Sequence, residues 1–303
     1  MPTLTCIKVS LTWSLFFNNQ NEGFMRFLIT SLLFFVVLCS THSFATQDVL
    51  GTAHYLGNEG VLVVGTQKKI LFDPMFNKNF QRFSLVPESL KFKILENEAP
   101  FENIDVIFIS HSHADHFDAK EVSAYLHKYQ NVQLIAPTQV IEKLKLLGDD
   151  KKITTQLHEI SMILGEPPKA LSLAGVQVEV IRIPHVGWPE SADVENLVYR
   201  VTLDDVTVMH LGDSDINSEH YLPFSRFWAK KVTHHAFIPG VFAVNTNPEQ
   251  SLKAQFNVQS ITYIHIPMNV PDTLHQLKVD FFSVPDEIRE IINTNSSDLS
   301  SVL

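Results

Sequence analysis

The stretch His111-Ser112-His113-Ala114-Asp115-His116 places four side chains that can bind a metal within six residues. The apolar run Ile104–Ile109 before it is expected to be a strand, and Phe117–Tyr129 after it has helical spacing. The cluster therefore lies on a turn from strand to helix, and His111 and His113 point to one side because side chains alternate along an extended chain. Imidazoles and a carboxylate suit zinc and other divalent first-row ions. The segment predicts a metal site.

The pattern His-x-His-x-Asp-His after a strand resembles the signature of the metallo-β-lactamase superfamily. The resemblance extends from about Gly51 to about Pro267, because four further motifs of that superfamily follow its order along the chain. They are Leu71–Pro74 with Asp73, Ile183–Gly187 with His185, His210–Asp213, and Ile261–Pro267 with His265. The local sequence Tyr55–Leu62 is similar to a group of bacterial superfamily hydrolases, and broadly to the branch of ascorbate-6-phosphate lactonase and N-acyl-phosphatidylethanolamine phospholipase D.

The resemblance implies a centre of two divalent ions, with zinc expected. His111, His113 and His185 would hold the first ion, and Asp115, His116 and His265 the second. Asp213 would bridge the two, and Asp73 would brace the metal loop without binding metal. Two ions at such a spacing can hold a shared hydroxide and polarise a substrate oxygen. Asp115 is then the expected catalytic residue, because it would orient the hydroxide and move its proton.

Taken singly, the later motifs have plainer interpretations. His185 is also compatible with an ordinary loop histidine, Asp213 with a turn residue after a glycine, and His265 with a core residue at a strand end. His210 is expected beside the ligands rather than among them. His234-His235 is expected to open a strand outside the site. Ordinary surface or core roles are expected for His54, His127, His158, His220 and His275.

The N-terminus reads as a targeting segment. Met25-Arg26 forms a short basic region before the apolar run Phe27–Leu38, which is too short for a spanning helix of about 20 residues. Small residues in Ser43–Ala45 predict signal-peptide cleavage after Ala45, with translation expected to start at Met25. The alternatives are an uncleaved membrane anchor and a lipoprotein acylated at Cys39. The expected product is a secreted or periplasmic protein without stable membrane association.

Cysteine content and charge narrow the function further. Cys6 and Cys39 both lie in the predicted presequence of residues 1–45, so the mature chain 46–303 has no cysteine for a disulfide, a nucleophile or a metal ligand. The formal net charge is −10, and the presequence is itself slightly basic. An acidic chain of this kind does not predict nucleic-acid binding. The expected partner is a small-molecule substrate, and the sequence leaves the oligomeric state open.

The order of expected elements predicts the fold class. Two strand-rich halves, each with helices, predict two sheets packed face to face with helices outside, which is the four-layer αββα sandwich that the resemblance implies, in a single domain over 46–303. Pro285–Ile292 is expected to be a closing helix, since a proline and acidic residues begin it. The expected strands include Val49–Tyr55, Val61–Gly65, Lys69–Phe72, Val132–Ala136, Val176–Ile183, Leu197–Leu203, Val206–Leu211, Ala236–Pro239 and Ile261–Ile266.

These observations predict an exported hydrolase that cleaves a lactone, another ester or amide, or a phosphodiester. Two alternatives stay open: a non-hydrolytic metal-binding or sensing protein on the same fold, and a di-iron redox enzyme, because imidazoles and carboxylates also bind iron. Trp188 is a candidate for the pocket wall or for plain packing. Met75-Phe76 and Phe80 are expected on a loop that overhangs the metals.

Overall fold

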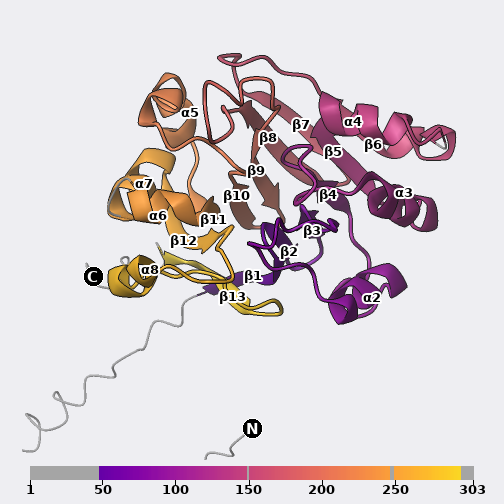
Figure 1. The fold of residues 1–303 in the computed structure, drawn as a ribbon, viewed down its shortest axis with the longest axis horizontal. Helices are drawn as coiled ribbons and strands as arrows, with labels where there is room; N and C mark the ends of the chain where they lie inside the picture. Colours follow the sequence, from indigo (N-terminus) through magenta and orange to yellow (C-terminus); the bar gives the residue numbers. More distant parts are fainter. Residues whose placement is uncertain (1–47, 149, 246–248, 295–303) are drawn as a thin grey trace, which may run out of the picture. The chain divides into compact units, whose positions relative to one another are not determined.

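Two β-sheets face each other, and helices cover the outer face of each (Figure 1). The computed structural model describes residues 48–148, 150–245 and 249–294. The predicted signal peptide, its cleavage site and both cysteines therefore lie outside the described residues. Within the described ranges, none of the helices combines the length and apolarity that crossing a membrane requires.

The first sheet has seven strands in the order β13-β1-β2-β3-β4-β5-β6, and the second has six in the order β12-β11-β10-β9-β8-β7. The first sheet consists of β1 (Asp48–Gly57), β2 (Gly60–Val64), β3 (Lys69–Phe72), β4 (Val106–Phe108), β5 (Gln133–Pro137), β6 (Leu157–Ile160) and β13 (Ile288–Asn293). The second consists of β7 (Lys169–Leu173), β8 (Val176–Arg182), β9 (Leu197–Leu203), β10 (Val206–His210), β11 (Thr233–Pro239) and β12 (Val258–Ile264).

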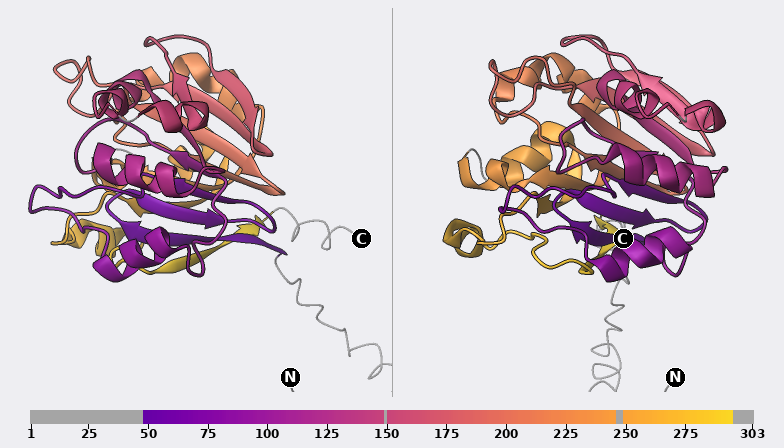
Figure 2. Two further views of the ribbon diagram at one scale, coloured as in Figure 1. Left: turned by 90° about the vertical axis from the view of Figure 1, so that its right-hand side faces the viewer. Right: turned by 45° about the vertical axis from the view of Figure 1, so that its right-hand side comes forward.

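The helices divide between the two outer faces (Figure 2). The first sheet carries α2 (Glu88–Glu96), α3 (Ala119–Lys128) and α4 (Thr138–Lys145). The second carries α5 (Ser225–Ala229), α6 (Gly240–Asn245), α7 (Glu249–Phe256) and α8 (Asp272–Leu277). Short 3₁₀ turns lie at Asp150–Lys152, Thr154–Gln156, Ser218–His220 and Leu222–Phe224. The predicted αββα sandwich is confirmed.

Three apolar layers hold the sandwich together, and alternation along the strands assigns residues to them. In β3, Ile70 and Phe72 face the opposite sheet, whereas Leu71 faces the helices. Phe72 stacks on Phe108 of β4 with ring centroids 5.1 Å apart, and Tyr199 of β9 packs on Phe108 from the second sheet. The two sheets therefore share one aromatic core directly below the edge that carries the candidate site.

The predicted closing helix over Pro285–Ile292 is wrong, because this segment forms strand β13. Ile288–Asn293 pairs antiparallel with β1, and Ile291 is fully buried between the sheets. The β-branched isoleucines fit a pleated, half-buried surface, and the open edge of β1 supplies a hydrogen-bonding partner. These tertiary contacts outweigh the local helix-start signal of Pro285 and the acidic residues that follow it.

Strand direction brings the functional loops to one edge. β3, β4 and β5 run parallel, as do β10, β11 and β12. Carboxyl ends of parallel strands meet at one edge, where open α/β sheets bind their ligands. Asp73, Ser110, Asp213 and His265 all follow such strand ends, so the fold gathers side chains that are far apart in the sequence.

Candidate metal centre

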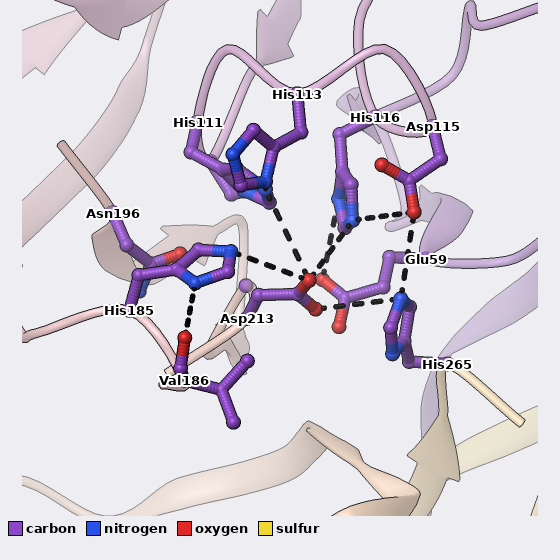
Figure 3. A network of polar contacts seen from close by, with 12 residues as sticks. Glu59, His111, His113, Asp115, His116, His185, Val186, Asn196, Asp213 and His265 are labelled. Atoms are coloured by element: carbon purple, nitrogen blue, oxygen red, sulfur yellow. Dashed lines mark hydrogen bonds and ion pairs between the residues drawn. The ribbon is translucent and has the colours of Figure 1, made fainter. Parts of the chain in front are cut away.

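The structure brings all seven sequence-predicted ligands together at this edge (Figure 3). Within each of two groups, the potential ligand atoms lie within 4.8 Å of one another. The groups are His111, His113, His185 and Asp213, and Asp115, His116 and His265. Their membership matches the two ion sites expected from the sequence.

Asp213 lies between the two groups, where a bridging carboxylate would lie. Its Oδ2 is 3.5 Å from Nε2 of His185 and 3.5 Å from Nε2 of His116. Its Oδ1 is 3.5 Å from Nε2 of His265. Each oxygen of this one carboxylate therefore faces imidazoles, and together the two oxygens face both groups.

The loop between β4 and α3 is held as a tight turn by its own backbone. The N–H groups of His116 and Phe117 both donate to the carbonyl of His113, at 3.1 and 3.0 Å. Asp118 then caps α3, since its carboxylate accepts from the backbone N–H of Lys120 and Glu121. The turn brings Nε2 of His111 within 3.0 Å of Nδ1 of His113, a separation suited to two ligands of one ion.

Hydrogen bonds on the far side of three rings set which nitrogen faces the centre. Asp73 accepts from the backbone N–H of Ser110 at 2.7 Å, from its hydroxyl at 2.5 Å, and from Nδ1 of His116 at 3.0 Å. Because the Ser110 hydroxyl gives its proton to Asp73, it accepts from Nδ1 of His111. Nδ1 of His185 donates to the carbonyl of Val186 at 2.7 Å. All three rings thus turn Nε2 toward the centre, where it can bind a metal when the ring is neutral.

The loops that carry His185 and Asp213 are tied to each other. Val186 N–H donates to the Asp213 carbonyl and Asp215 N–H to the Pro184 carbonyl, both at 2.7 Å. Gly212, with φ of +55°, precedes the aspartate, and a Cβ there would lie 2.4 Å from Oδ1 of Asn196. Only glycine fits this close approach, so the bridge position depends on it.

Asn58 links Asp115 to His265, two members of the second group that lie far apart in the sequence. The side-chain Nδ2 of Asn58 donates to the backbone carbonyl of Asp115 at 2.9 Å. The backbone carbonyl of Asn58 accepts from the backbone N–H of His265 at 3.0 Å. Asn58, Asp73 and His265 all adopt positive φ. Left-handed backbone in non-glycine residues is costly and concentrates at functional sites.

Burial and neighbouring charges shift the pKa values of the side chains in the centre away from their ordinary values. Burial lowers the pKa of His111 well below its ordinary value, and burial likewise lowers the pKa of His113. Burial opposes the shift of Asp213, but His265 and His116 outweigh it and hold the pKa of Asp213 well below its ordinary value. Burial opposes the shift of His116, but Asp213 outweighs it and raises the pKa of His116 well above its ordinary value. Because metal binds neutral imidazoles and ionised carboxylates, His116 has to release a proton to bind metal, whereas His111, His113 and Asp213 do not.

The donor set fits divalent ions. Buried Nε2 of His116, His185 and His265, and buried Oδ1 of Asp213, accept or donate no hydrogen bond among the described residues. Buried polar atoms are normally satisfied, and such orphans cost free energy unless a partner compensates them. Nε2 of His185 lies in the first group and Nε2 of His116 and His265 in the second, with Asp213 between them, so one cation in each group would satisfy these atoms.

An apolar cavity of about 260 Å³ opens beside the centre. Its wall includes Phe83, whose ring lies 3.9 Å from that of His265, together with Val241 and Leu274. Arg82 lies at the same cavity with an exposed side chain. The cavity can hold a mostly apolar group with its polar end at Asp213 and His265.

The expected overhang by Met75-Phe76 is wrong, because both side chains are buried in the core under α2 and α3. Apolar side chains that follow a strand can pack in the core as well as line a site, and Met75 and Phe76 pack in the core. Phe80 is 67% exposed. The segment reaches the centre only further along, at Arg82 and Phe83. Trp188 borders a different cavity with Arg182 and His220.

The remaining histidines find protein partners. His210 donates from Nε2 to the Glu59 carbonyl and accepts at Nδ1 from Gly212 N–H, so it supports the centre from behind. His234 accepts from the backbone N–H of Thr207, and Nε2 of His235 lies 2.8 Å from the Thr262 hydroxyl. None of the metal-capable groups of described residues contains His54, His127, His158, His220 or His275.

Sequence reasoning missed Glu59, whose side chain is fully buried beside Asp213 and His116. Burial, followed by the charge of Asp213, raises the pKa of Glu59 well above its ordinary value. A signal was available: Glu59 stands in a tight turn between two apolar strands, at the same sheet edge as Asp73. A charged residue in that position has no solvent-facing strand surface to explain it.

Comparison with known proteins agrees with the fold and the donor set. Residues 52–227 match the family described as β-lactamase superfamily domain, and the chain belongs to this family. The superfamily resemblance seen in the sequence is thereby confirmed. A UPF0173 metal-dependent hydrolase from Pyrococcus horikoshii is 26% identical over 166 residues, which cover 53% of this chain and 60% of the relative.

Solved structures share the architecture at low sequence identity. The metallo-β-lactamase fold protein YhfI from Bacillus subtilis superimposes with a TM-score of 0.53 at 15% identity, covering 80% of this chain and 100% of YhfI. A variant of the β-hydroxylase CmlA, from Streptomyces venezuelae, gives a TM-score of 0.50 at 12% identity over 81% of this chain and 55% of CmlA. At these identities the similarity concerns the fold.

Proposed function

We propose that the protein is a metal-dependent hydrolase with two divalent ions, zinc being the expected metal. The observation that carries this proposal is the set of buried, unpartnered nitrogen atoms of His116, His185 and His265, each 3.5 Å from an oxygen of Asp213. His111, His113 and His185 would hold one ion, Asp115, His116 and His265 the other, and Asp213 both. Two such ions supply a water of lowered pKa and a Lewis acid for the substrate oxygen.

Asp115 is suited to proton movement. Its Oδ2 lies 3.7 Å from Nε2 of both His116 and His265, and Asn58 fixes its backbone. Burial opposes the shift, but His265 and His116 outweigh it and lower the pKa of Asp115, so the group is ionised at neutral pH and can accept a proton. It would orient the attacking water and return its proton to the leaving group.

The cavity favours a small-molecule substrate with an apolar portion next to the scissile bond. Phe83, Val241 and Leu274 would exclude water from that portion. The bond is a lactone, another ester or amide, or a phosphodiester. Asp213 and His265 line the same cavity, so the carbonyl or phosphoryl oxygen of this bond would lie at the metals.

The rival functions are a non-hydrolytic metal sensor and a di-iron redox enzyme. CmlA, a diiron β-hydroxylase, shares the fold, which is why the di-iron alternative is retained. Asp115 argues against a sensor, because beside binding the second ion it can move a proton, which metal binding alone does not require. An apolar cavity that opens directly on the ligands can also hold a substrate, which a protein that only binds or senses a metal does not require.

We also propose that the protein is exported, with cleavage after Ala45. The apolar run Phe27–Leu38 and the small residues before Thr46 support this. N-terminal sequencing of protein from its native host tests it. A chain that begins at Thr46 is expected, and one that retains Phe27–Leu38 would show an anchor.

The decisive experiment for the reaction combines metal analysis with a substrate panel. Protein purified without chelator is expected to contain about two divalent ions per chain and to hydrolyse at least one of an ester, a lactone, a phosphodiester and a β-lactam. Removal of the metal should abolish turnover, and re-addition should restore it. Metal-loaded protein that hydrolyses none of the panel, yet binds an apolar ligand, would favour the sensor instead.

A further inference from the structure

Arg82 is a cation at the wall of the apolar cavity beside the candidate metal centre. Among the described residues that line this cavity, it is the one lysine or arginine. Its side chain is exposed. The arginine side chains that form ion pairs or hydrogen bonds within the described chain are those of Arg182, Arg200 and Arg289. The guanidinium of Arg82 is therefore open to an anion of a bound ligand.

The turn that carries Arg82 is held in one shape by Asn79. The side-chain Nδ2 of Asn79 donates to the Phe83 carbonyl at 2.9 Å, and its Oδ1 accepts from the backbone N–H of Gln81 at 3.0 Å. The Asn79 carbonyl accepts from the backbone N–H of Arg82 at 2.8 Å. Phe80 and Gln81 both adopt positive φ, which is costly for residues other than glycine and concentrates at functional sites.

The same turn is joined to the segment that follows His265. The carbonyl of Arg82 accepts from the backbone N–H of Met268 at 2.8 Å, and Phe83 pairs with Pro267 in an antiparallel bridge. The guanidinium carbon of Arg82 lies 5.2 Å from the centroid of the Phe83 ring, which lies 3.9 Å from the centroid of the His265 ring. Together these two contacts keep the guanidinium within about 9 Å of a candidate metal ligand.

The charge of the chain makes an arginine in this position informative. The formal net charge is −10, so the protein as a whole repels anions. Asp213, the acidic residue of the cavity wall, faces the imidazoles of the centre. The planar guanidinium offers paired N–H groups that fit the oxygens of a carboxylate or a phosphate. Arg82 thus gives this cavity an attraction for anions that the rest of the acidic chain does not give it.

We propose that Arg82 binds an anionic group, a carboxylate or a phosphate, at the end of the substrate away from the scissile bond. The substrate class is then an amphipathic anion, with its hydrolysable bond at the metals and its apolar portion against Phe83 and Leu274. This inference deepens the proposed function and rests on it for the position of the bond. The anion site itself rests on Arg82 and the cavity.

The test measures the binding of two ligand pairs by calorimetry at low ionic strength, with Zn²⁺-loaded protein. Hexanoate and adipate differ in a second carboxylate at the far end of the chain. Butylphosphonate and butane-1,4-bisphosphonate differ in a second phosphonate, which stands in for phosphate. Because both members of a pair offer the same group to the metals, the ratio of their affinities reports the binding of the second anion.

Arg82→Gln removes the charge and keeps a long polar side chain. The preference for the dianion should be about 5–30-fold larger in the wild type than in this variant, for at least one ligand pair. The affinity for the monoanion should stay within about twofold. Arg82→Lys should keep part of the preference, because it retains the charge and loses the fork of N–H groups.

The control is Arg226→Gln, the same change at an exposed arginine on α5 that does not line the cavity. It should leave the preference unchanged. The wild-type chain gives a second measurement that needs no variant: its preference for the dianion should shrink as NaCl is added, since salt screens an exposed charge pair. A preference that salt does not change would overturn the proposal.

Two further results would overturn the anion site. An equal preference in the wild type and in Arg82→Gln would show that Arg82 does not bind the second anion. Equal losses for both members of each pair would show that Arg82 only packs on Phe83. The pair whose preference depends on Arg82 identifies the group as carboxylate or phosphate. A chain that binds no metal would overturn the proposed function, whereas a preference that depends on Arg82 in that chain would still support the anion site.

Discussion

Two segments of this chain are dense in histidine, His111–His116 and His234-His235, and they differ in what their ring nitrogens meet. In the first segment, Nδ1 of His116 is held by Asp73 and its buried Nε2 is left without a protein partner. In the second, Nδ1 of His234 accepts from a backbone N–H and Nε2 of His235 is engaged by Thr262. The buried Nδ1 of His235 also has no hydrogen-bond partner, but His235 belongs to none of the metal-capable groups of the described residues. The first segment follows the end of β4, whereas the second lies within β11. Position at a strand end, rather than histidine density, distinguishes the candidate ligands.

Asp115→Asn is expected to have the largest effect on turnover, and it tests whether the first segment forms the site. The variant loses the group that would orient the attacking water and accept its proton, so kcat should fall about 10²–10⁴-fold even where metal is partly kept. Bound metal and kcat are measured together on the substrate that the panel identifies. Near-normal turnover in Asp115→Asn, with turnover abolished in His235→Ala, would move the site to the second segment.

Asp73→Asn should have the next largest effect. Asp73 holds the Nδ1 side of His116 and both donors of Ser110. Loss of its charge should weaken metal affinity about 10–100-fold, as is usual for groups that orient a metal-bound imidazole. Chelator competition measures this affinity. An unchanged affinity would show that the turn backbone alone orients His116.

His235→Gln should change stability rather than metal binding. Burial lowers the pKa of His235 to about 4 from an ordinary 6.5. Between these values the unfolded chain binds a proton that the folded chain does not, so stability is full above pH 6.5 and is lost as the pH falls towards 4. The loss amounts to about 3 kcal/mol. Urea unfolding of metal-free wild-type and variant chains at several pH values should show this component in the wild type and not in the variant.

The smallest effect is expected from His234→Ala. Its half-buried ring only accepts a hydrogen bond from Thr207 N–H, so the variant should lose about 1 kcal/mol of stability and keep metal content and kcat within about twofold. Urea unfolding, elemental analysis and steady-state kinetics check the three quantities. Loss of an ion in this variant would contradict the contrast between the two segments.

Local patterns predicted much of this architecture. The metal site is predictable because four candidate ligands, His111, His113, Asp115 and His116, stand within six residues. Strands such as Val206–Leu211 are predictable because a run of neighbouring apolar residues indicates them. Glu59 carries no such pattern: its burial beside Asp213 depends on how β1 and β10 meet in space. The helix expected over Pro285–Ile292 failed for a related reason, since the strand form of this segment needs an edge supplied by β1.

Asn58 adds a consequence for the order of folding. It joins Asp115, 57 residues further along, to His265, which lies much further along still, so the second group is closed by contacts of long sequence separation. Such contacts form late and slowly, because the entropy of closing long loops opposes them until the intervening chain is in place. The second group therefore exists only when the turn after β1, the loop after β4 and the end of β12 have come together, and the His111–His116 segment alone does not provide it.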